Sequence, residues 1–210
     1  MLINEIFYSL QGEGIWVGLP TIFIRTTGCN LRCSYCDTIY AYDQGDNMKI
    51  SEMLSTIIKY PCKLVCLTGG EPLLQEDIMT LIDALLSDHY HICVETNGSI
   101  SLQSFQQPIK SLMFSMDIKC PSSGMASKMN LENLTLLQKK DQVKFVIQTK
   151  KDYRYAKDII EQKNISCPII FQPVWGSSYP QLAQWIIDDG LSVRFGIQLQ
   201  KILWGETQGT

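Results

Sequence analysis

Short apolar runs alternate with segments of helical periodicity along most of the chain. The runs are rich in Val, Ile, Leu and Phe and show little polar alternation, which is typical of strands covered on both faces. They predict strands at residues 21–27, 63–68, 91–96, 112–118, 142–148, 168–174 and 192–198.

Between these runs, apolar residues recur three and four positions apart, and this spacing predicts amphipathic helices. Ser51 is a suitable N-cap for a helix that runs to about residue 60. Further helices are predicted at 75–87, 130–140, 152–162 and 180–188, the last of them opening with Pro180 in a first turn that tolerates it.

The repeated order of strand, helix and strand implies a parallel sheet with right-handed crossovers. A complete eightfold barrel typically takes about 250 residues. The 210 residues here therefore favour a single-domain α/β fold, a pared-down, partial parallel β/α barrel that spans residues 1–210. In such a fold the chemistry gathers where the strands end. Conspicuous segments follow the first three predicted strands, at 28–29, 69–72 and 97–98.

Composition and charge exclude several classes of protein. The formal net charge of −3 argues against a broad nucleic-acid interface. No apolar run approaches the roughly 20 residues that a membrane span needs. The first residues lack the positive region of a secretory signal, so the cytoplasm is the expected location.

The cysteines fall into two groups. Five are scattered, mostly in or beside apolar runs, and are predicted to be small buried thiols: Cys62, Cys66, Cys93, Cys120 and Cys167. The other three, Cys29, Cys33 and Cys36, follow one another at intervals of four and three. A compact loop with this spacing directs three thiolates at one cubane cluster, and three ligands leave one iron open to a further ligand.

Two simpler metal proteins remain open at this point. Structural zinc requires a fourth ligand, and the candidates Cys62, Cys66, His89 and His91 are distant in sequence. A ferredoxin-like electron carrier rarely builds a whole α/β domain around three ligands. Either protein would be a binding module rather than an enzyme.

The cysteine loop resembles the CxxxCxxC signature of the radical S-adenosylmethionine (SAM) superfamily, with Tyr35 as the aromatic residue before the last cysteine. The resemblance implies a [4Fe–4S] cluster whose open iron is chelated by SAM, and reductive cleavage of SAM to a 5′-deoxyadenosyl radical. Residues 68–72 are similar to the GGEP segment that holds the SAM amino group in this superfamily. Glycine permits close backbone approach there, and a carboxylate accepts from an ammonium.

Residues 4–14, 18–21, 23–25 and 36–38 narrow the resemblance to the 7-carboxy-7-deazaguanine synthases. The likeness continues through 95–98, 119–123, 172–173 and 203–205, and so spans nearly the whole chain. It implies a lyase that converts 6-carboxy-5,6,7,8-tetrahydropterin to 7-carboxy-7-deazaguanine and ammonia, with SAM regenerated and Mg²⁺ assisting. It also implies a homodimer and flavodoxin or ferredoxin as the reductant.

The same resemblance implies roles for individual residues. Substrate contacts are expected from Leu10, Gln11, Gly12, Glu13, Arg25, Thr68 and Thr210. SAM contacts are expected from Gly69, Gly70, Glu71, Glu95, Asp117, Ile118, Lys119 and Gln172, and a Mg²⁺ contact from Thr38. The chemistry is compatible, because a guanidine-like edge needs acceptors, a carboxylate needs a cation and Mg²⁺ prefers hard oxygens.

Each of these residues also has an ordinary structural explanation. On that view, residues 11–14 form an exposed turn and Arg25 forms a surface ion pair. Thr38 is then a helix cap or turn residue, and Lys119 is a solvated loop lysine. Two positions depart from the family: 117–119 read Asp-Ile-Lys where Ser-Pro-Lys is common, and Gln200 stands where some relatives have His.

One competing enzyme class shares the cysteine motif. Glycyl-radical activating enzymes also combine CxxxCxxC with a trimmed barrel, but they act on a protein loop. Nothing in that function accounts for the segments at 11–14 and 37–38. The sequence leaves open whether the deazapurine serves queuosine, archaeosine or a secondary metabolite.

Overall fold

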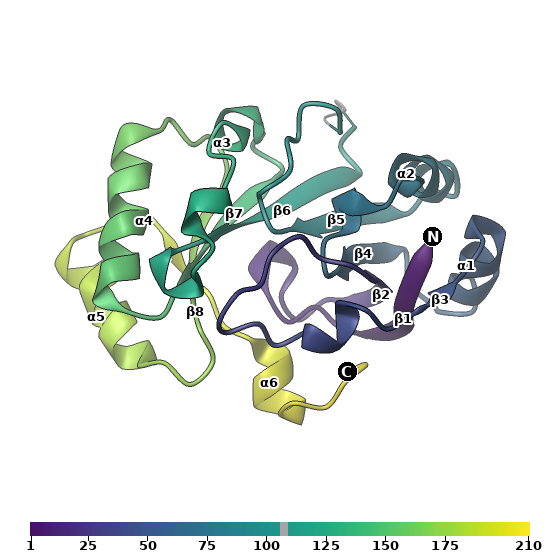
Figure 1. Cartoon of the computed structure of the whole chain (residues 1–210), viewed down its shortest axis with the longest axis horizontal. Coiled ribbons are helices and arrows are strands. Elements are labelled where there is room, and N and C mark those ends of the chain that lie inside the picture. Colours follow the sequence, from purple (N-terminus) through teal and green to yellow (C-terminus); the bar gives the residue numbers. More distant parts are fainter. Residues whose placement is uncertain (106–108) are drawn as a thin grey trace.

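A twisted sheet forms the centre of the structure, a computed structural model that describes residues 1–105 and 109–210 (Figure 1). The strands are β1 (Leu2–Leu10), β2 (Pro20–Thr26), β3 (Asp46–Asn47), β4 (Leu64–Gly69), β5 (His91–Thr96), β6 (Leu112–Lys119), β7 (Gln142–Ile147), β8 (Ile169–Pro173) and β9 (Arg194–Phe195). Their order in the sheet is β3-β1-β2-β4-β5-β6-β7-β8-β9. Neighbours from β2 onward are parallel, whereas β1 is antiparallel to both β2 and β3. The predicted partial parallel barrel is confirmed.

Helices connect the parallel strands. The α-helices are α1 (Ile50–Ile57), α2 (Ile78–Ser87), α3 (Asn133–Leu136), α4 (Lys150–Gln162), α5 (Tyr179–Asp188) and α6 (Leu199–Trp204). Short 3-10 helices lie at η1 (Gly14–Trp16), η2 (Ile39–Ala41), η3 (Pro72–Leu74), η4 (Pro121–Ser123) and η5 (Ala126–Lys128). The apolar stripe of α2, with Leu81 and Leu85 fully buried, packs into the core between helices and sheet.

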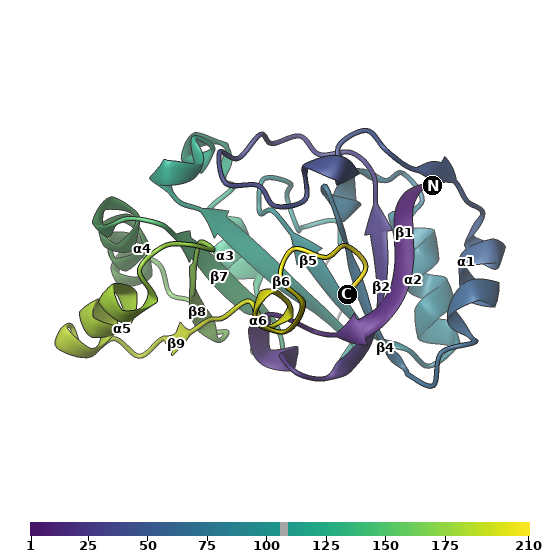
Figure 2. The ribbon, with the colours of Figure 1, turned by 90° about the horizontal axis from the view of Figure 1, so that it is seen from below.

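Strand alternation divides the sheet into two faces. In β4, Val65 and Leu67 enter the core beneath the helices, while Cys66 and Thr68 point to the opposite face and line a cavity there. Glu95 on β5 lines the same cavity. Figure 2 shows α6 and the C-terminal segment crossing the sheet on this inner face. The fold thus places polar side chains of several strands in one cavity, which α6 and the C-terminal segment cover.

The sequence predicted all seven of the parallel strands but missed β1, β3 and α6. The last predicted strand, 192–198, shrinks to Arg194–Phe195. Ser51 as a cap was wrong: the helix begins at Ile50, and the Glu52 carboxylate accepts from the Lys49 N–H at 2.8 Å.

The helix predicted at 130–140 was also wrong in extent, since only Asn133–Leu136 is α-helical. Its first residue, Asn133, is buried and is tied to the preceding loop. The amide of Asn133 donates to the Ile100 carbonyl at 2.7 Å and accepts from the Leu102 N–H at 2.9 Å. Leu137 then turns to extended backbone, which ends the helix.

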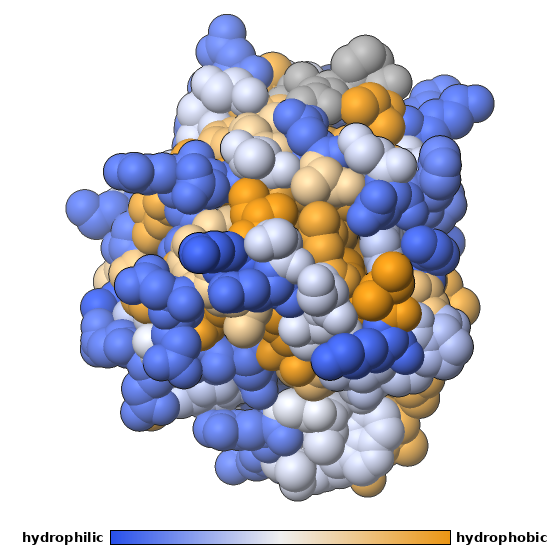
Figure 3. All heavy atoms as spheres, turned by 90° about the vertical axis from the view of Figure 1, so that its right-hand side faces the viewer, coloured by the Kyte–Doolittle hydropathy of each residue, from blue (hydrophilic) through white to orange (hydrophobic). Residues whose placement is uncertain are grey.

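The outer surface is mixed in character. Figure 3 shows the side of the molecule where α1 lies, and on this side apolar areas lie between hydrophilic side chains. Among the described residues, no helix has the length and apolar character needed to span a bilayer.

Candidate active site

A cavity of about 510 Å³ opens at the carboxyl ends of the central strands, on the inner face of the sheet. Most of the predicted site residues line it: Leu10, Gln11, Gly12, Glu13, Arg25, Cys29, Cys33, Cys36, Thr38, Thr68, Gly69, Gly70, Glu95, Asp117, Lys119, Gln172 and Thr210. Glu71 and Ile118 are not part of the lining and are fully buried elsewhere. The volume suits a cofactor-sized or small-molecule ligand.

The three clustered cysteines lie on the loop after β2 and all line this cavity as free thiols. Burial raises the pKa of Cys29 and Cys33, and at Cys33 the charge of Lys119 partly opposes this rise. Such thiols become thiolates readily only when a metal binds them. The loop therefore fits a metal-thiolate group better than an isolated nucleophile.

The donor set fits an iron–sulfur cluster better than zinc. Within residues 1–105 and 109–210, no three His, Cys, Asp or Glu side chains converge on a single ion. A cubane needs no such convergence, because each of its cysteines binds a separate iron. Of the four candidate fourth zinc ligands, His89, His91 and Cys62 lie before or at the start of β4 and β5, at the opposite ends of the strands. The fourth candidate, Cys66, lines the cavity, but within the described residues it does not form a metal-binding group with the loop cysteines. Four of the five scattered cysteines, Cys66, Cys93, Cys120 and Cys167, are buried as predicted, whereas Cys62 is only half-buried.

The cysteine loop is joined to the glycine segment after β4 by the backbone. The Glu71 N–H donates to the Gly28 carbonyl at 2.7 Å, and the Gly70 N–H donates to the Thr26 carbonyl at 3.2 Å. The Asn97 amide, at the end of β5, contacts the Cys29 sulfur at 3.8 Å. Ends of three neighbouring strands thus fix one side of the loop.

The Glu71 carboxylate points away from the cavity. It accepts from the Leu73 N–H at 3.1 Å, the Thr96 hydroxyl at 2.9 Å and the Asn97 N–H at 2.6 Å. The expectation that this carboxylate faces the SAM ammonium does not match its placement, and the adjacent Gly69 and Gly70 line the cavity instead. Ile118 belongs to the apolar core, because its side chain alternates away from Asp117 and Lys119.

Glu71 also predicts a pH dependence of stability. Burial raises its pKa from the ordinary 4.5 to about 7. Between these values the folded state binds more protons than the unfolded chain, so stability falls as pH rises through this window. We expect the metal-free wild type to lose about 3 kcal/mol relative to Glu71→Gln between pH 4 and pH 8, measured by urea unfolding. An exposed control, Glu132→Gln, should track the wild type. Parallel curves for wild type and Glu71→Gln would contradict the assignment.

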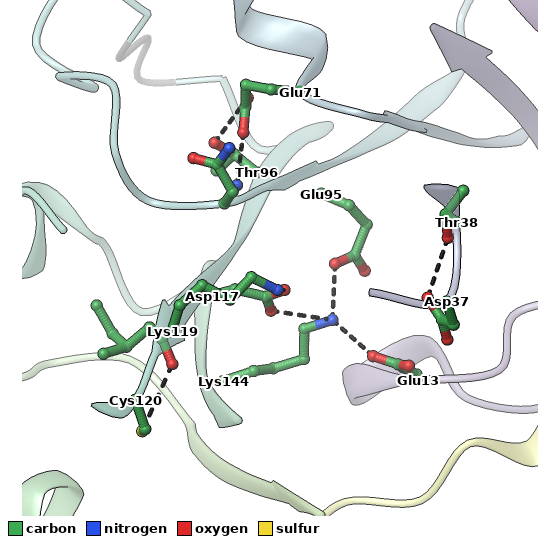
Figure 4. A network of polar contacts seen from close by, with 12 residues as sticks. Glu13, Asp37, Thr38, Glu71, Glu95, Thr96, Asp117, Lys119, Cys120 and Lys144 are labelled. Carbon is green, nitrogen blue, oxygen red and sulfur yellow. Dashed lines mark hydrogen bonds and ion pairs between the residues drawn. The ribbon is translucent and has the colours of Figure 1, made fainter. Parts of the chain in front are cut away.

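A buried lysine joins the carboxylates of the cavity floor (Figure 4). Lys144 Nζ on β7 lies 2.8 Å from Glu13 Oε2, 2.8 Å from Glu95 Oε2 and 3.3 Å from Asp117 Oδ1. Its side chain is only 4% exposed. Burial works against its charge, but the three carboxylates outweigh burial and raise the pKa of Lys144. We call these four residues the Lys144 cluster. Sequence reasoning missed Lys144, although a lysine inside an apolar strand was a usable signal.

Lys119 belongs to the same floor and is not a solvated loop residue. Its ammonium lies 2.7 Å from Asp117 Oδ2. Burial opposes the charge of Asp117, but Lys119 and then Lys144 lower the pKa of this carboxyl. The aspartate that departs from the family pattern therefore serves as an ionised partner for two lysines.

The C-terminal part lines the cavity with Gln200, which the sequence singled out, and with Gln198 and Lys201, which it did not reveal. The Gln198 amide donates to Glu13 Oε1 at 3.0 Å and to Asp37 Oδ2 at 3.3 Å. Lys201 lies 3.0 Å from Asp37, and this ion pair outweighs burial and lowers the pKa of Asp37. Gln200 packs on Gly12, where an added Cβ would lie 1.7 Å from the Gln200 Oε1.

The structural alternatives for residues 11–14, Arg25 and Thr38 fare differently in the structure. Gln11 is 5% exposed, so residues 11–14 are not a plain exposed turn. Arg25 does form an ion pair, with Nε 2.8 Å from Glu5 Oε1, and it also lines the cavity. Thr38 stands at the N-cap position of η2 without a capping hydrogen bond, and its hydroxyl donates to Asp37 at 3.0 Å.

Comparison with known proteins agrees with this geometry. The family model of the radical SAM superfamily matches residues 23–115. A 7-carboxy-7-deazaguanine synthase of Thermoplasma acidophilum is 37% identical over 209 residues and covers 100% of both chains. That of Methanospirillum hungatei is 41% identical over 204 residues, with 97% of this chain and 85% of the relative covered.

A crystal structure of QueE from Escherichia coli has a TM-score of 0.75, with 94% of this chain and 93% of that chain covered. At 21% identity this likeness bears on the fold alone. Family membership rests on the full-length relatives and on the cysteine loop that the cavity contains. The chain belongs to the 7-carboxy-7-deazaguanine synthase family of the radical SAM superfamily.

Proposed function

We propose that this chain converts 6-carboxy-5,6,7,8-tetrahydropterin to 7-carboxy-7-deazaguanine with release of ammonia. The observation that carries the proposal is one cavity lined both by Cys29, Cys33 and Cys36 and by a polar set suited to the pterin. One-electron chemistry at the substrate is supplied by a [4Fe–4S] cluster with SAM when both are bound. The full-length relatives bear the corresponding name.

The substrate is recognised at its two polar ends. Glu13 and Gln11 provide acceptors for the guanidine-like edge of the pterin, and both line the cavity. The guanidinium of Arg25 offers a cation to the substrate carboxylate from the end of β2. Thr68 lies next to Arg25 in the register of β2 and β4, so it meets the ligand between these ends.

The cofactor side of the cavity is built from strand ends further along the sheet. Gly69 and Gly70 permit close backbone approach to SAM, while Glu95, Asp117 and Gln172 offer oxygens to its hydroxyl and ammonium groups. The hydroxyl of Thr38 is a hard oxygen of the kind that Mg²⁺ prefers, with substrate oxygens and water completing the shell. Cover by α6 limits water at the reacting centre.

The test is an anaerobic assay of the reconstituted protein with SAM, Mg²⁺, a strong reductant and 6-carboxytetrahydropterin, read by mass spectrometry. We expect 7-carboxy-7-deazaguanine in excess over 5′-deoxyadenosine, and a lower rate when Mg²⁺ is withheld. If 5′-deoxyadenosine forms without the deazapurine, the pterin substrate is wrong, and a glycyl-radical activating enzyme becomes the better hypothesis.

The setting of the enzyme is also proposed from the family. We expect a homodimer, a location in the cytoplasm and reduction by flavodoxin or ferredoxin. Light scattering tests the first of these, and product formation with each purified reductant in place of a chemical one tests the last.

A further inference from the structure

The Glu13 carboxylate is fixed at both of its oxygens by residues far away in the sequence. Lys144 Nζ lies 2.8 Å from Oε2, and the Gln198 amide donates to Oε1 at 3.0 Å. Glu13 itself lies in irregular backbone just before η1, so the local fold leaves its side chain free to rotate. The orientation of the carboxylate therefore depends on these two partners.

This arrangement leaves a defined pair of acceptors. Each carboxylate oxygen has two lone-pair directions, and the protein occupies one on each oxygen. The carboxylate lines the cavity, so the remaining directions serve a ligand there. Two parallel acceptors match a ligand edge with two neighbouring N–H donors, in the manner of a carboxylate paired with a guanidinium.

The backbone that carries Glu13 is held from the same strand. Gln142 precedes Lys144 by two positions on β7, so both side chains project from one face. The buried Gln142 amide accepts from the Ile15 N–H at 2.7 Å and donates to Ser115 Oγ at 2.7 Å. Gly14, with φ at +75°, makes the turn and leaves room, because a Cβ there would lie 2.2 Å from Gln142 Nε2.

We propose that Lys144 and Gln198 are positioning residues that aim Glu13 at the donor pair of the substrate and thereby set its specificity for a 2-amino-4-oxopyrimidine edge. The inference rests on the proposed function, because it presumes a pterin in this cavity. Lys144 also touches Glu95 and Asp117, so its loss affects the cofactor side. Gln198 contacts neither Glu95 nor Asp117. Its second contact is with Asp37, beside Cys36 and Thr38, so the SAM affinity of a Gln198 variant must be measured to show that the cofactor side is undisturbed.

The experiment compares two ligands that differ at this edge. Pterin-6-carboxylate carries the 2-amino donor, and lumazine-6-carboxylate has an oxo group in its place. Dissociation constants are measured by anaerobic titration calorimetry on the reconstituted enzyme. We expect the wild type to prefer the pterin on the order of 30-fold, since hydrogen bonds to a charged group discriminate by about this much.

Gln198→Leu should reduce the preference to about fivefold or less and leave SAM affinity within about twofold of the wild type. Lys144→Met should reduce the preference similarly and also weaken SAM binding, and Lys144→Arg should restore part of both. Matched controls are Gln184→Leu and Lys163→Met, whose side chains make exposed contacts on the surface, with Asp188 and Glu132 respectively. Both controls should keep the preference of the wild type.

The outcomes separate the two proposals. An unchanged preference in Gln198→Leu and Lys144→Met overturns the positioning role while the proposed function stands. Equal affinity of the wild type for both ligands also overturns the positioning role and leaves the proposed function standing. If the wild type binds neither ligand, the pterin assignment fails, and the inference fails with it. Should Lys144→Met not fold, Gln198→Leu alone decides the matter.

Discussion

Replacement of Cys33 by Ser is expected to leave the protein without a stable iron–sulfur cluster and without detectable deazapurine product. Cys33 is one of three thiols on the loop after β2, and the loop offers no further cysteine to replace it. A serine hydroxyl is a harder and far less acidic ligand than a thiol, so it binds iron poorly. Iron and acid-labile sulfide content, with the visible spectrum, measure the first loss, and the anaerobic assay measures the second.

A matched variant separates this effect from general damage. Cys62 is only partly buried, lies before β4 and does not line the main cavity. Cys62→Ser should therefore keep iron content and product formation close to the wild type. Full iron loading and activity in Cys33→Ser would show that the loop does not hold the cluster, and the assignment of the whole cavity would have to be revised.

The parts of the fold that could be predicted are those in which local pattern and burial agree. The strands β4 and β5 are apolar because both of their faces are buried, so their composition reveals them. The strand β1 lies near the sheet edge with most of its side chains half-buried, and its mixed sequence carries no such signal. Its antiparallel pairing with β2 is set by tertiary contacts rather than by periodicity.

The site likewise contains parts that a local sequence motif reveals and parts that only tertiary contacts bring together. The cysteine loop and the glycine segment after β4 are contiguous motifs, and the sequence places them at strand ends. Lys144 and Gln198 each contact Glu13, which lies more than a hundred residues away from either in the chain, so no contiguous motif reveals them. The direction in which the Glu71 side chain points was missed for a related reason. Its hydrogen-bond partners Thr96 and Asn97 come from the end of β5, and a sequence motif does not show which way a buried carboxylate turns.

Gly70→Ala is expected to lower kcat/KM by about 100-fold and to weaken SAM binding at least about tenfold, because a misplacement of roughly 1 Å costs that much in a catalytic site. A Cβ at Gly70 would lie 2.1 Å from the Gly28 carbonyl oxygen and 2.9 Å from the Cys29 Cβ. The first of these atoms is backbone and cannot rotate away. The glycine segment and the cysteine loop must therefore move apart.

Gly190→Ala is the comparison that isolates steric overlap from backbone strain in this test. Gly190 has φ at +60°, which disfavours alanine, but a Cβ there meets nothing within 4 Å. This variant should lose about 1 kcal/mol of stability and keep SAM affinity and kcat/KM. Gly70 lies outside the left-handed region, so its expected loss comes from the missing space beside Cys29. Equal SAM affinity in the two variants, measured by anaerobic titration, would show that the contact between the two loops does not control the cofactor side of the cavity.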